Sequence, residues 1–132
     1  PLVIPALNRD GDLLSDLVLQ LYGSIAGAES LVLGFDPDTL QVKTVMAEAP
    51  HGTAPALFGK NVANPMAMIL AGSALLDYFD TPEATQAARA IYESVFAVLE
   101  AGQATTDLGG QMTTTAFTDA VIDQVGRILA GG

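Results

Sequence analysis

The sequence contains no cysteine and no tryptophan, and it has only one histidine and five basic residues. Without cysteine there can be no disulfide, no thiolate zinc site and no cysteine nucleophile. The five lysines and arginines are outnumbered by 15 aspartates and glutamates, so the formal net charge is −10. A chain with this charge repels nucleic-acid phosphates and anionic lipid surfaces. We therefore expect neither nucleic acid nor a membrane among its partners, and the lack of cysteine favours the cytoplasm.

Long apolar runs and targeting signals are also missing. The longest apolar run, residues 66–76, is well short of the roughly 20 residues that cross a bilayer. No basic segment opens a signal peptide. The chain starts at Pro1, inside an apolar stretch, as a piece of a longer polypeptide would, although removal of an initiator methionine would leave the same end. Half of the 132 residues are hydrophobic and 15% are charged, which predicts one compact domain with a real core.

The spacing of apolar and turn-forming residues predicts a mixed α/β segment. In chain order, the expected elements are a strand over residues 2–7, a turn over 8–11, a helix from Asp12, a hairpin of strands 31–33 and 40–48, and helices over 64–79, 81–100 and 116–130. Asn64-Pro65 and Thr81-Pro82 are typical helix starts, with a capping residue followed by proline. These strands are too few for a complete doubly wound sheet. No G-x-G-x-x-G follows a strand, so a Rossmann dinucleotide site is not expected.

Apolar residues at helical spacing predict which helix faces are buried. The first helix has one apolar stripe, and the later helices contribute two further groups to the expected core. The stripe is Leu13, Leu14, Leu17, Val18 and Leu21; the core groups are Met66, Met68, Ile69 and Leu70, and Phe117, Val121, Val125, Ile128 and Leu129.

Asp12 and Asp16 are the sharpest chemical feature of the first helix. They are four residues apart and share one helix face, where two like charges are mildly destabilising. A hard divalent cation bound by both would convert that repulsion into attraction. The plainer interpretation is that Asp12 complements the helix N-terminus and that Asp16 is a solvated surface residue. The spacing alone favours the plainer interpretation.

The segment 48–65 joins the hairpin to the next helix and contains the only histidine, His51. Its backbone amides, its hydroxyl at Thr53 and its Asn64 at a helix start suit a polar ligand with an aromatic base and phosphates. A lone histidine without cysteine cannot form a zinc site, and no Ser/His/Asp motif order is present. On these grounds alone, His51 is more often a hydrogen-bonded loop residue than a functional one.

Three motifs resemble those of the isocitrate/isopropylmalate dehydrogenases, the β-decarboxylating dehydrogenase family. They are Asn-Arg-Asp-Gly-Asp-Leu-Leu-Ser-Asp at 8–16, Glu-Ala-Pro-His-Gly-Thr-Ala-Pro at 48–55 with Gly59-Lys60 and Asn64-Pro65, and Thr-Asp-Leu-Gly-Gly at 106–110 with Thr113-Thr114. The resemblance implies a C-terminal portion of the three-layer α/β fold of that family. It also implies a strand and metal-binding helix near the subunit interface in residues 1–27 and a nucleotide-binding lobe in residues 28–132.

The resemblance assigns an expected role to each matching residue. Asp12 and Asp16 match two same-subunit ligands of Mg²⁺ or Mn²⁺, which reverses the preference drawn from spacing. Glu48 matches a residue beside the nicotinamide ribose, and Asn64 and Asp107 match contacts to the adenine. The loop that wraps the adenosine and phosphates is matched by His51, Gly52, Thr53 and Ala54.

The function implied by the resemblance is NAD-dependent oxidative decarboxylation of a 2-hydroxy acid, of the isocitrate or 3-isopropylmalate type, by a homodimer. The substrate-binding arginines and a tyrosine come from the N-terminal half of such enzymes, and a lysine and an aspartate come from the second subunit. This sequence therefore contains no complete catalytic set. A stand-alone adenine-nucleotide-binding protein and a non-catalytic subunit derived from the family are the alternatives.

The choice of NAD over NADP depends on four positions. Enzymes of the family that use NADP bind its 2′-phosphate with a lysine, two tyrosines and an arginine. The matching residues here are Ala56, Leu57, Thr106 and Gly110. None is positively charged, which argues against NADP. The aspartate that NAD enzymes usually place at the position of Ala56 is missing too, so the sequence rejects NADP more clearly than it selects NAD.

Overall fold

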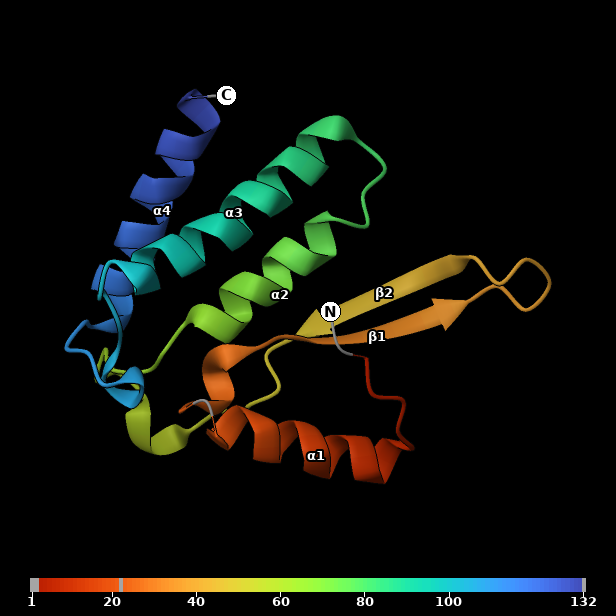
Figure 1. Ribbon diagram of the computed structural model, residues 1–132, viewed down its shortest axis with the longest axis horizontal. Helices are drawn as coiled ribbons and strands as arrows, with labels where there is room; N and C mark the ends of the chain where they lie inside the picture. Colours follow the sequence, from red (N-terminus) through yellow and green to blue (C-terminus); the bar gives the residue numbers. More distant parts are fainter. Residues whose placement is uncertain (1–2, 22, 132) are drawn as a thin grey trace.

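The computed structural model describes residues 3–21 and 23–131, and within them the chain folds into a mixed α/β structure, as predicted (Figure 1). The elements are α1 (Asn8–Leu21), η1 (Ile25–Gly27), β1 (Ser30–Phe35), β2 (Val42–Glu48), η2 (Pro55–Leu57), α2 (Met66–Leu76), α3 (Pro82–Glu100), η3 (Thr106–Leu108) and α4 (Thr114–Ala130), where η marks a short 3₁₀ helix. The predicted hairpin and the three helices after it are confirmed. The helix expected over 64–79 is shorter than predicted and ends at Leu76.

The three later helices form the core of the molecule. Helix α3 lies between α2 and α4 and packs against both (Figure 1). Each helix contributes two buried side chains to one cluster: Met66 and Leu70, Val95 and Val98, and Phe117 and Val121. Phe117 has no exposed surface, and truncating a buried phenylalanine to alanine costs about 3–5 kcal/mol. The cluster fixes the starts of α2 and α4 relative to each other, and the loops at those starts carry the motifs.

Side-chain caps set where these helices begin. The hydroxyl of Thr81 accepts from the backbone N–H of Ala84 at 3.2 Å, with Pro82 in the first turn of α3. Thr113 accepts in the same way from the N–H of Ala116, at 3.1 Å, at the start of α4. Each cap supplies a partner for a backbone donor that the first turn leaves unpaired, which stabilises the helix by about 1 kcal/mol.

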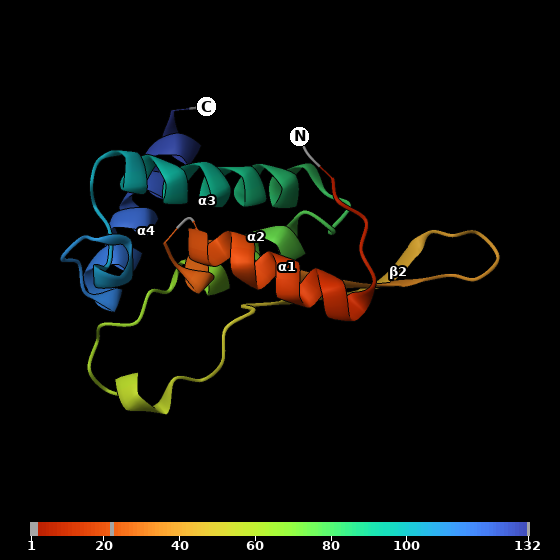
Figure 2. The ribbon, with the colours of Figure 1, turned by 60° about the horizontal axis from the view of Figure 1, so that its bottom comes forward.

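The hairpin of β1 and β2 is antiparallel, with Ser30 opposite Glu48 and Gly34 opposite Thr44, and with a register shift after Gly34. Its inner end contacts α2, and its outer end extends away from the helices (Figure 1). Because β2 ends at Glu48 against α2, the segment that follows starts beside the helical core. That segment, which includes η2, extends outward from the body before returning to α2 (Figure 2).

The predicted N-terminal strand and the turn after it are wrong. Residues 3–7 form no strand and are exposed, while Leu2 lies outside the described residues. A strand needs a hydrogen-bonded neighbour, and the sheet of the described residues contains β1 and β2 alone. Residues 8–11 are already helical, because the N–H of Gly11 donates to the carbonyl of Leu7 at 2.8 Å. Helix α1 therefore begins at Asn8, four residues earlier than predicted.

The apolar stripe of α1 exists but is not covered. Leu13 is 74% exposed and Leu21 is 76% exposed, and no residue of α1 is buried. Among the described elements, α1 makes contacts only with η1. Two residues of the predicted core, Met68 and Leu129, are likewise exposed. The stripe of α1 is thus apolar as predicted, but the other described elements do not cover it, whereas Met66, Leu70, Phe117 and Val121 are buried as the pattern predicted.

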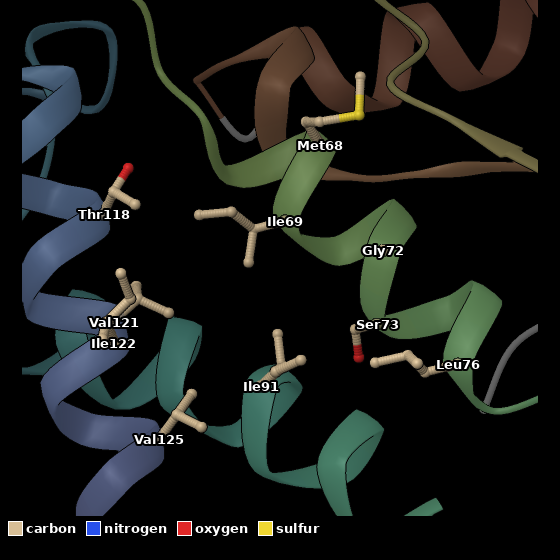
Figure 3. Close-up of a pocket in the computed structure, with 10 residues that line it drawn as sticks. All are labelled: Met68, Ile69, Gly72, Ser73, Leu76, Ile91, Thr118, Val121, Ile122 and Val125. Carbon is tan, nitrogen blue, oxygen red and sulfur yellow. The ribbon is translucent and has the colours of Figure 1, made fainter. Parts of the chain in front are cut away.

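An apolar pocket of about 430 Å³ lies between α2, α3 and α4. Ile69, Ile91 and Val125 converge on it from the three helices (Figure 3). Its remaining lining residues are Met68, Gly72, Ser73, Leu76, Thr118, Val121 and Ile122. The hydroxyl of Ser73 donates to the carbonyl of Ala88 at 2.7 Å, so it is already bonded. The pocket therefore continues the uncovered apolar surface and offers little polar chemistry to a ligand.

None of the helices described here combines the length and the apolar character that crossing a bilayer requires.

Candidate functional site

A second pocket, of about 640 Å³, lies where three segments distant in the sequence meet. Its lining residues are Ser24 and Ala26 from the start of η1, His51, Gly52, Thr53, Ala54, Leu57, Phe58, Val62, Ala63 and Asn64 from the loop between β2 and α2, and Thr106 and Asp107 from η3. A volume of this size is typical of small-molecule and cofactor sites.

Six of the seven residues proposed for cofactor binding line this pocket: His51, Gly52, Thr53, Ala54, Asn64 and Asp107. The seventh, Glu48, does not line it. Glu48 is the exposed last residue of β2 and pairs with Ser30 across the hairpin. The structure thus brings the loop motif and the Thr-Asp-Leu-Gly-Gly motif to one place, although 43 positions separate Asn64 from Asp107.

Asp107 is the polar centre of the pocket. Its Oδ2 accepts from the hydroxyl of Ser24 and from Nδ2 of Asn64, the latter at 3.0 Å. Its Oδ1 accepts from the hydroxyl of Thr105 at 2.6 Å. Partial burial alone would raise the pKa of Asp107, but the hydrogen bonds from Ser24, Thr105 and Asn64 stabilise the charged form and lower the pKa below its ordinary value. The carboxylate is therefore ionised at neutral pH and joins three segments.

The loop that carries Asp107 turns back sharply at Gly110. The N–H of Gly110 donates to the carbonyl of Thr105 at 2.9 Å, and the N–H of Met112 donates to that of Ala104 at 2.9 Å. A Cβ at position 110 would lie only 1.9 Å from the carbonyl oxygen of Ala104. Only glycine fits this position, which is the physical reason for the second glycine of the motif.

His51 and Ala54 shape the opposite wall. His51 is half-buried, and its Nδ1 lies 3.0 Å from the carbonyl oxygen of Gly52. Because a carbonyl only accepts, Nδ1 donates in this contact, and Nε2 is left as an acceptor in the neutral ring. Ala54 has φ 42° and ψ 63°, the left-handed region that residues with a side chain rarely adopt. The pocket wall therefore contains a strained backbone position, as binding sites often do.

Charge is sparse in the pocket. Asp107 is the only acidic residue among those that line it, and they include no lysine or arginine. A ligand group that carries a dianionic phosphate would find no cationic side chain here. Neutral aromatic and hydroxyl groups, by contrast, match the amide of Asn64, the imidazole of His51 and the apolar side chains beside them.

Asp12 and Asp16 lie in the second and third turns of α1, not at its start, so Asp12 does not complement the helix N-terminus as the plainer interpretation held. Both are exposed, and neither lines the two pockets above. Within residues 3–21 and 23–131, the only ion pair is between Arg89 and Glu93. Neither aspartate therefore forms an ion pair with Arg9 or Lys60. The same residues contain no cluster of three or more potential metal ligands. Two carboxylates fit part of an Mg²⁺ shell, which usually keeps several waters.

The sequence analysis did not identify three residues whose hydrogen bonds hold the walls of the pocket: Ser24, Asn61 and Thr115. Ser24 bonds Asp107, while Asn61 accepts two hydrogen bonds from Thr115 at the start of α4. Ser24 stands in a run of small residues that predicts only the end of a helix. For Asn61 and Thr115 a signal exists, since asparagine favours left-handed turns and threonine favours helix starts.

Comparisons with known proteins match most of the chain to one family. The sequence profile described as isocitrate/isopropylmalate dehydrogenase matches residues 2–125. An isocitrate/homoisocitrate dehydrogenase of Thermus thermophilus is 44% identical over 92% of this chain and 33% of that protein. The 3-isopropylmalate dehydrogenase B of Aspergillus niger is 42% identical over 91% of this chain and 32% of its own length.

Solved structures agree with these relatives. A β-decarboxylating dehydrogenase from Thermococcus kodakarensis, in its apo form, matches with a TM-score of 0.76 and 32% identity, over 93% of this chain and 33% of that one. An isocitrate dehydrogenase from Methylococcus capsulatus matches with a TM-score of 0.67 and 36% identity, over 87% of this chain and 32% of that one. The chain therefore spans about a third of the length of its relatives. It belongs to the isocitrate/isopropylmalate dehydrogenase family.

Proposed function

We propose that this chain is the C-terminal, cofactor- and metal-binding part of an NAD-dependent enzyme that oxidatively decarboxylates a 2-hydroxy acid of the isocitrate or 3-isopropylmalate type. The observation that carries the proposal is the second pocket. Six residues that match the family's nucleotide positions line it, and they come from segments that the sequence keeps far apart. A chance resemblance in short motifs would not also produce a pocket of cofactor size.

The residues present fit the adenosine half of a dinucleotide. Asn64 and His51 provide hydrogen-bonding groups on the pocket wall, and Leu57 and Val62 provide apolar surface for a base. The backbone at Gly52 and Thr53 offers N–H groups to phosphate oxygens, as loops before helices often do. Glu48, at the end of β2, would lie toward the nicotinamide ribose, outside this pocket.

Asp12 and Asp16 of α1 are proposed to hold the divalent cation, Mg²⁺ or Mn²⁺. When bound, the cation would polarise the carbonyl group that follows hydride transfer, so that CO₂ can leave. Asp12 and Asp16 contribute two carboxylates, and water and substrate would supply the other oxygens. Because both side chains are exposed here, the cleft around them would be completed by the rest of the polypeptide and by a second subunit.

The uncovered apolar surfaces support the proposal that the rest of the polypeptide and a second subunit pack against this chain. The stripe of α1, the exposed Met68 of α2 and the pocket between α2, α3 and α4 are all apolar and open to solvent. A chain that spans a third of its relatives would leave such surfaces where the other two thirds pack. We accordingly propose that residues 1–27 contribute to a homodimer interface and that residues 28–132 form the nucleotide-binding lobe.

The proposal is tested on the intact parent enzyme, meaning the full-length protein of which this chain would be the C-terminal part. Asp12→Asn and Asp16→Asn should each lower the metal-dependent kcat by at least about 100-fold while NAD binding, measured by calorimetry, changes little. Asp10→Asn, an exposed neighbour on the same helix, is the matched control and should leave kcat unchanged. Reduction of NAD by Asp12→Asn at the wild-type rate, with either isocitrate or 3-isopropylmalate, would reject the metal role. A parent enzyme that binds no dinucleotide would reject the proposal as a whole.

A further inference from the structure

Ser24 is a buried serine at the start of η1, and it lies outside all three sequence motifs. Its Oγ accepts from the N–H of Ala26 at 3.1 Å, which caps the 3₁₀ helix. Its single hydroxyl hydrogen is donated to Oδ2 of Asp107. This hydroxyl thus both accepts and donates, and its only hydrogen is committed to the bond that leads directly into the pocket.

Asp107 is nearly saturated by groups of the chain itself. A carboxylate offers roughly four lone-pair positions. Ser24 and Asn64 occupy Oδ2, and Thr105 occupies Oδ1. Little capacity is left for a bound base, so the chief effect of this carboxylate is on the groups that it holds in place.

The carboxylate of Asp107 and a backbone N–H together determine the orientation of the Asn64 amide. A carboxylate only accepts, so Asn64 must turn Nδ2 toward Asp107, at 3.0 Å. On its other side, Oδ1 accepts from the N–H of Met66 at 2.9 Å, and a backbone N–H only donates. The two contacts exclude the flipped amide. One Nδ2 hydrogen and one Oδ1 lone pair remain without a partner in the described chain, and Asn64 lines the pocket.

An amide held in one orientation distinguishes purines by the group at C6. On its Watson–Crick edge, adenine carries this amino donor beside the N1 acceptor, and the pair matches the carboxamide of asparagine. Hypoxanthine carries a carbonyl acceptor at C6 beside an N1–H donor, so on the same edge it would need the flipped amide. An asparagine that can flip accommodates both bases, whereas one that cannot flip accepts adenine only.

We propose that Ser24, acting through Asp107, is a positioning residue that locks the amide of Asn64 for adenine and against 6-oxopurines. This inference rests on the proposed nucleotide function of the pocket and adds a specificity determinant to it. Ser24 itself touches neither base nor phosphate in this scheme. Its role is to hold the carboxylate against Nδ2 of Asn64, so that the amide keeps both of its contacts.

The test compares NAD with nicotinamide hypoxanthine dinucleotide on the intact parent enzyme. The wild type should prefer NAD by about tenfold or more in kcat/KM, since a mismatched buried hydrogen bond costs at least this much. Ser24→Ala should reduce that preference by about threefold or more, through KM, with kcat for NAD nearly unchanged. Ser24→Thr keeps the hydroxyl and should restore the preference.

Ser94→Ala is the matched control, because Ser94 is a buried serine that donates to the carbonyl of Ala90 within α3, away from the pocket. It should lower the melting temperature without changing the preference. An equal loss of affinity of Ser24→Ala for both dinucleotides would overturn the inference, since a purely structural serine predicts that result. If Ser24→Ala does not fold, Asp107→Asn replaces it, and an unchanged preference in that variant also overturns the inference. A wild type that binds neither dinucleotide contradicts the proposed function instead.

Discussion

Asn61 accepts two hydrogen bonds from Thr115: Oδ1 lies 3.0 Å from the backbone nitrogen and 2.9 Å from the hydroxyl of that residue. The carbonyl of Asn61 also accepts from the N–H of Thr114 at 3.0 Å. These contacts fasten the end of the pocket loop to the first turn of α4. Asn61 has φ 56°, in the left-handed region, which asparagine tolerates better than most residues. A single asparagine therefore both turns the loop and attaches it.

Asn61→Gly should destabilise the parent enzyme by about 1–2 kcal/mol, because it keeps the left-handed backbone but leaves the donors of Thr115 without their acceptor. Chemical denaturation measures the free energy of unfolding. Amide hydrogen exchange should rise in the loop before α2 and not in α3. Asn61→Asp is the control, since it keeps the acceptor oxygen and should lose less stability. Equal losses in the two variants would show that the hydrogen bonds to Thr115 contribute nothing.

Ala54→Gly should stabilise the loop. Ala54 adopts φ 42° immediately before Pro55, and both the positive φ and the following proline disfavour this conformation for alanine. Glycine removes the strain, so the free energy of unfolding should rise by up to about 1 kcal/mol, offset in part by a more flexible unfolded chain. Ala56→Gly is the control, because Ala56 is not among the positive-φ residues, and it should destabilise. A decrease in stability for Ala54→Gly would show that the loop relieves the strain elsewhere.

An element of this fold could be predicted from the sequence when the chain also contains the element that packs against it or pairs with it. The helices α3 and α4 were predicted closely because Thr81-Pro82 marks the start of α3 and because the apolar faces of both helices pack against each other. The strand expected over residues 2–7 failed because an apolar run forms a strand only beside another strand, and residues 3–7 pair with neither β1 nor β2. Met68 failed as a core residue for a similar reason, since its side of α2 lacks a covering layer.

The pocket was predicted only in part. His51 and Asn64 could be grouped because they share one loop, and Asp107 joined them through the resemblance alone. Ser24 could not be found, because its bond to Asp107 spans 83 positions and follows from the packing of η1 against α2. Contacts of this kind are set by tertiary structure, and neither composition nor periodicity contains them.

Asp107 should make the free energy of unfolding depend on pH in the acidic range. Partial burial raises its pKa, but the hydrogen bonds from Ser24, Thr105 and Asn64 together outweigh burial and lower the pKa in the folded state. The stabilising effect of the carboxylate is therefore present at pH values above the ordinary 3.8 and is lost as the pH falls through the lower folded value. Asp107→Asn should therefore be less stable than the wild type at neutral pH. The difference in the free energy of unfolding should narrow as the pH falls below 3.8. A difference that stays constant with pH would show that the carboxylate charge is irrelevant.

The 132-residue chain alone should neither reduce NAD with isocitrate or 3-isopropylmalate nor remain monomeric. It lacks the substrate-binding groups expected from the rest of the enzyme, and Leu13 and Leu17 are exposed on α1. Sedimentation should show concentration-dependent association, and the double variant Leu13→Gln, Leu17→Gln should reduce it. Asp10→Asn, on the same helix, should not. Turnover that persists after removal of any full-length enzyme would contradict this expectation.

The parent enzyme should prefer NAD to NADP, and one added cationic side chain in the pocket should change that preference. The residues that line the pocket include no lysine or arginine, and position 110 has no room for an arginine because a Cβ there meets the backbone of Ala104. Thr106 is exposed and lines the pocket, so Thr106→Lys should raise kcat/KM for NADP by about tenfold, the effect of one charge-assisted contact. Thr106→Gln, polar but neutral, is the control and should leave the ratio unchanged. A wild-type preference for NADP above about tenfold would mean that a cation outside this chain binds the 2′-phosphate.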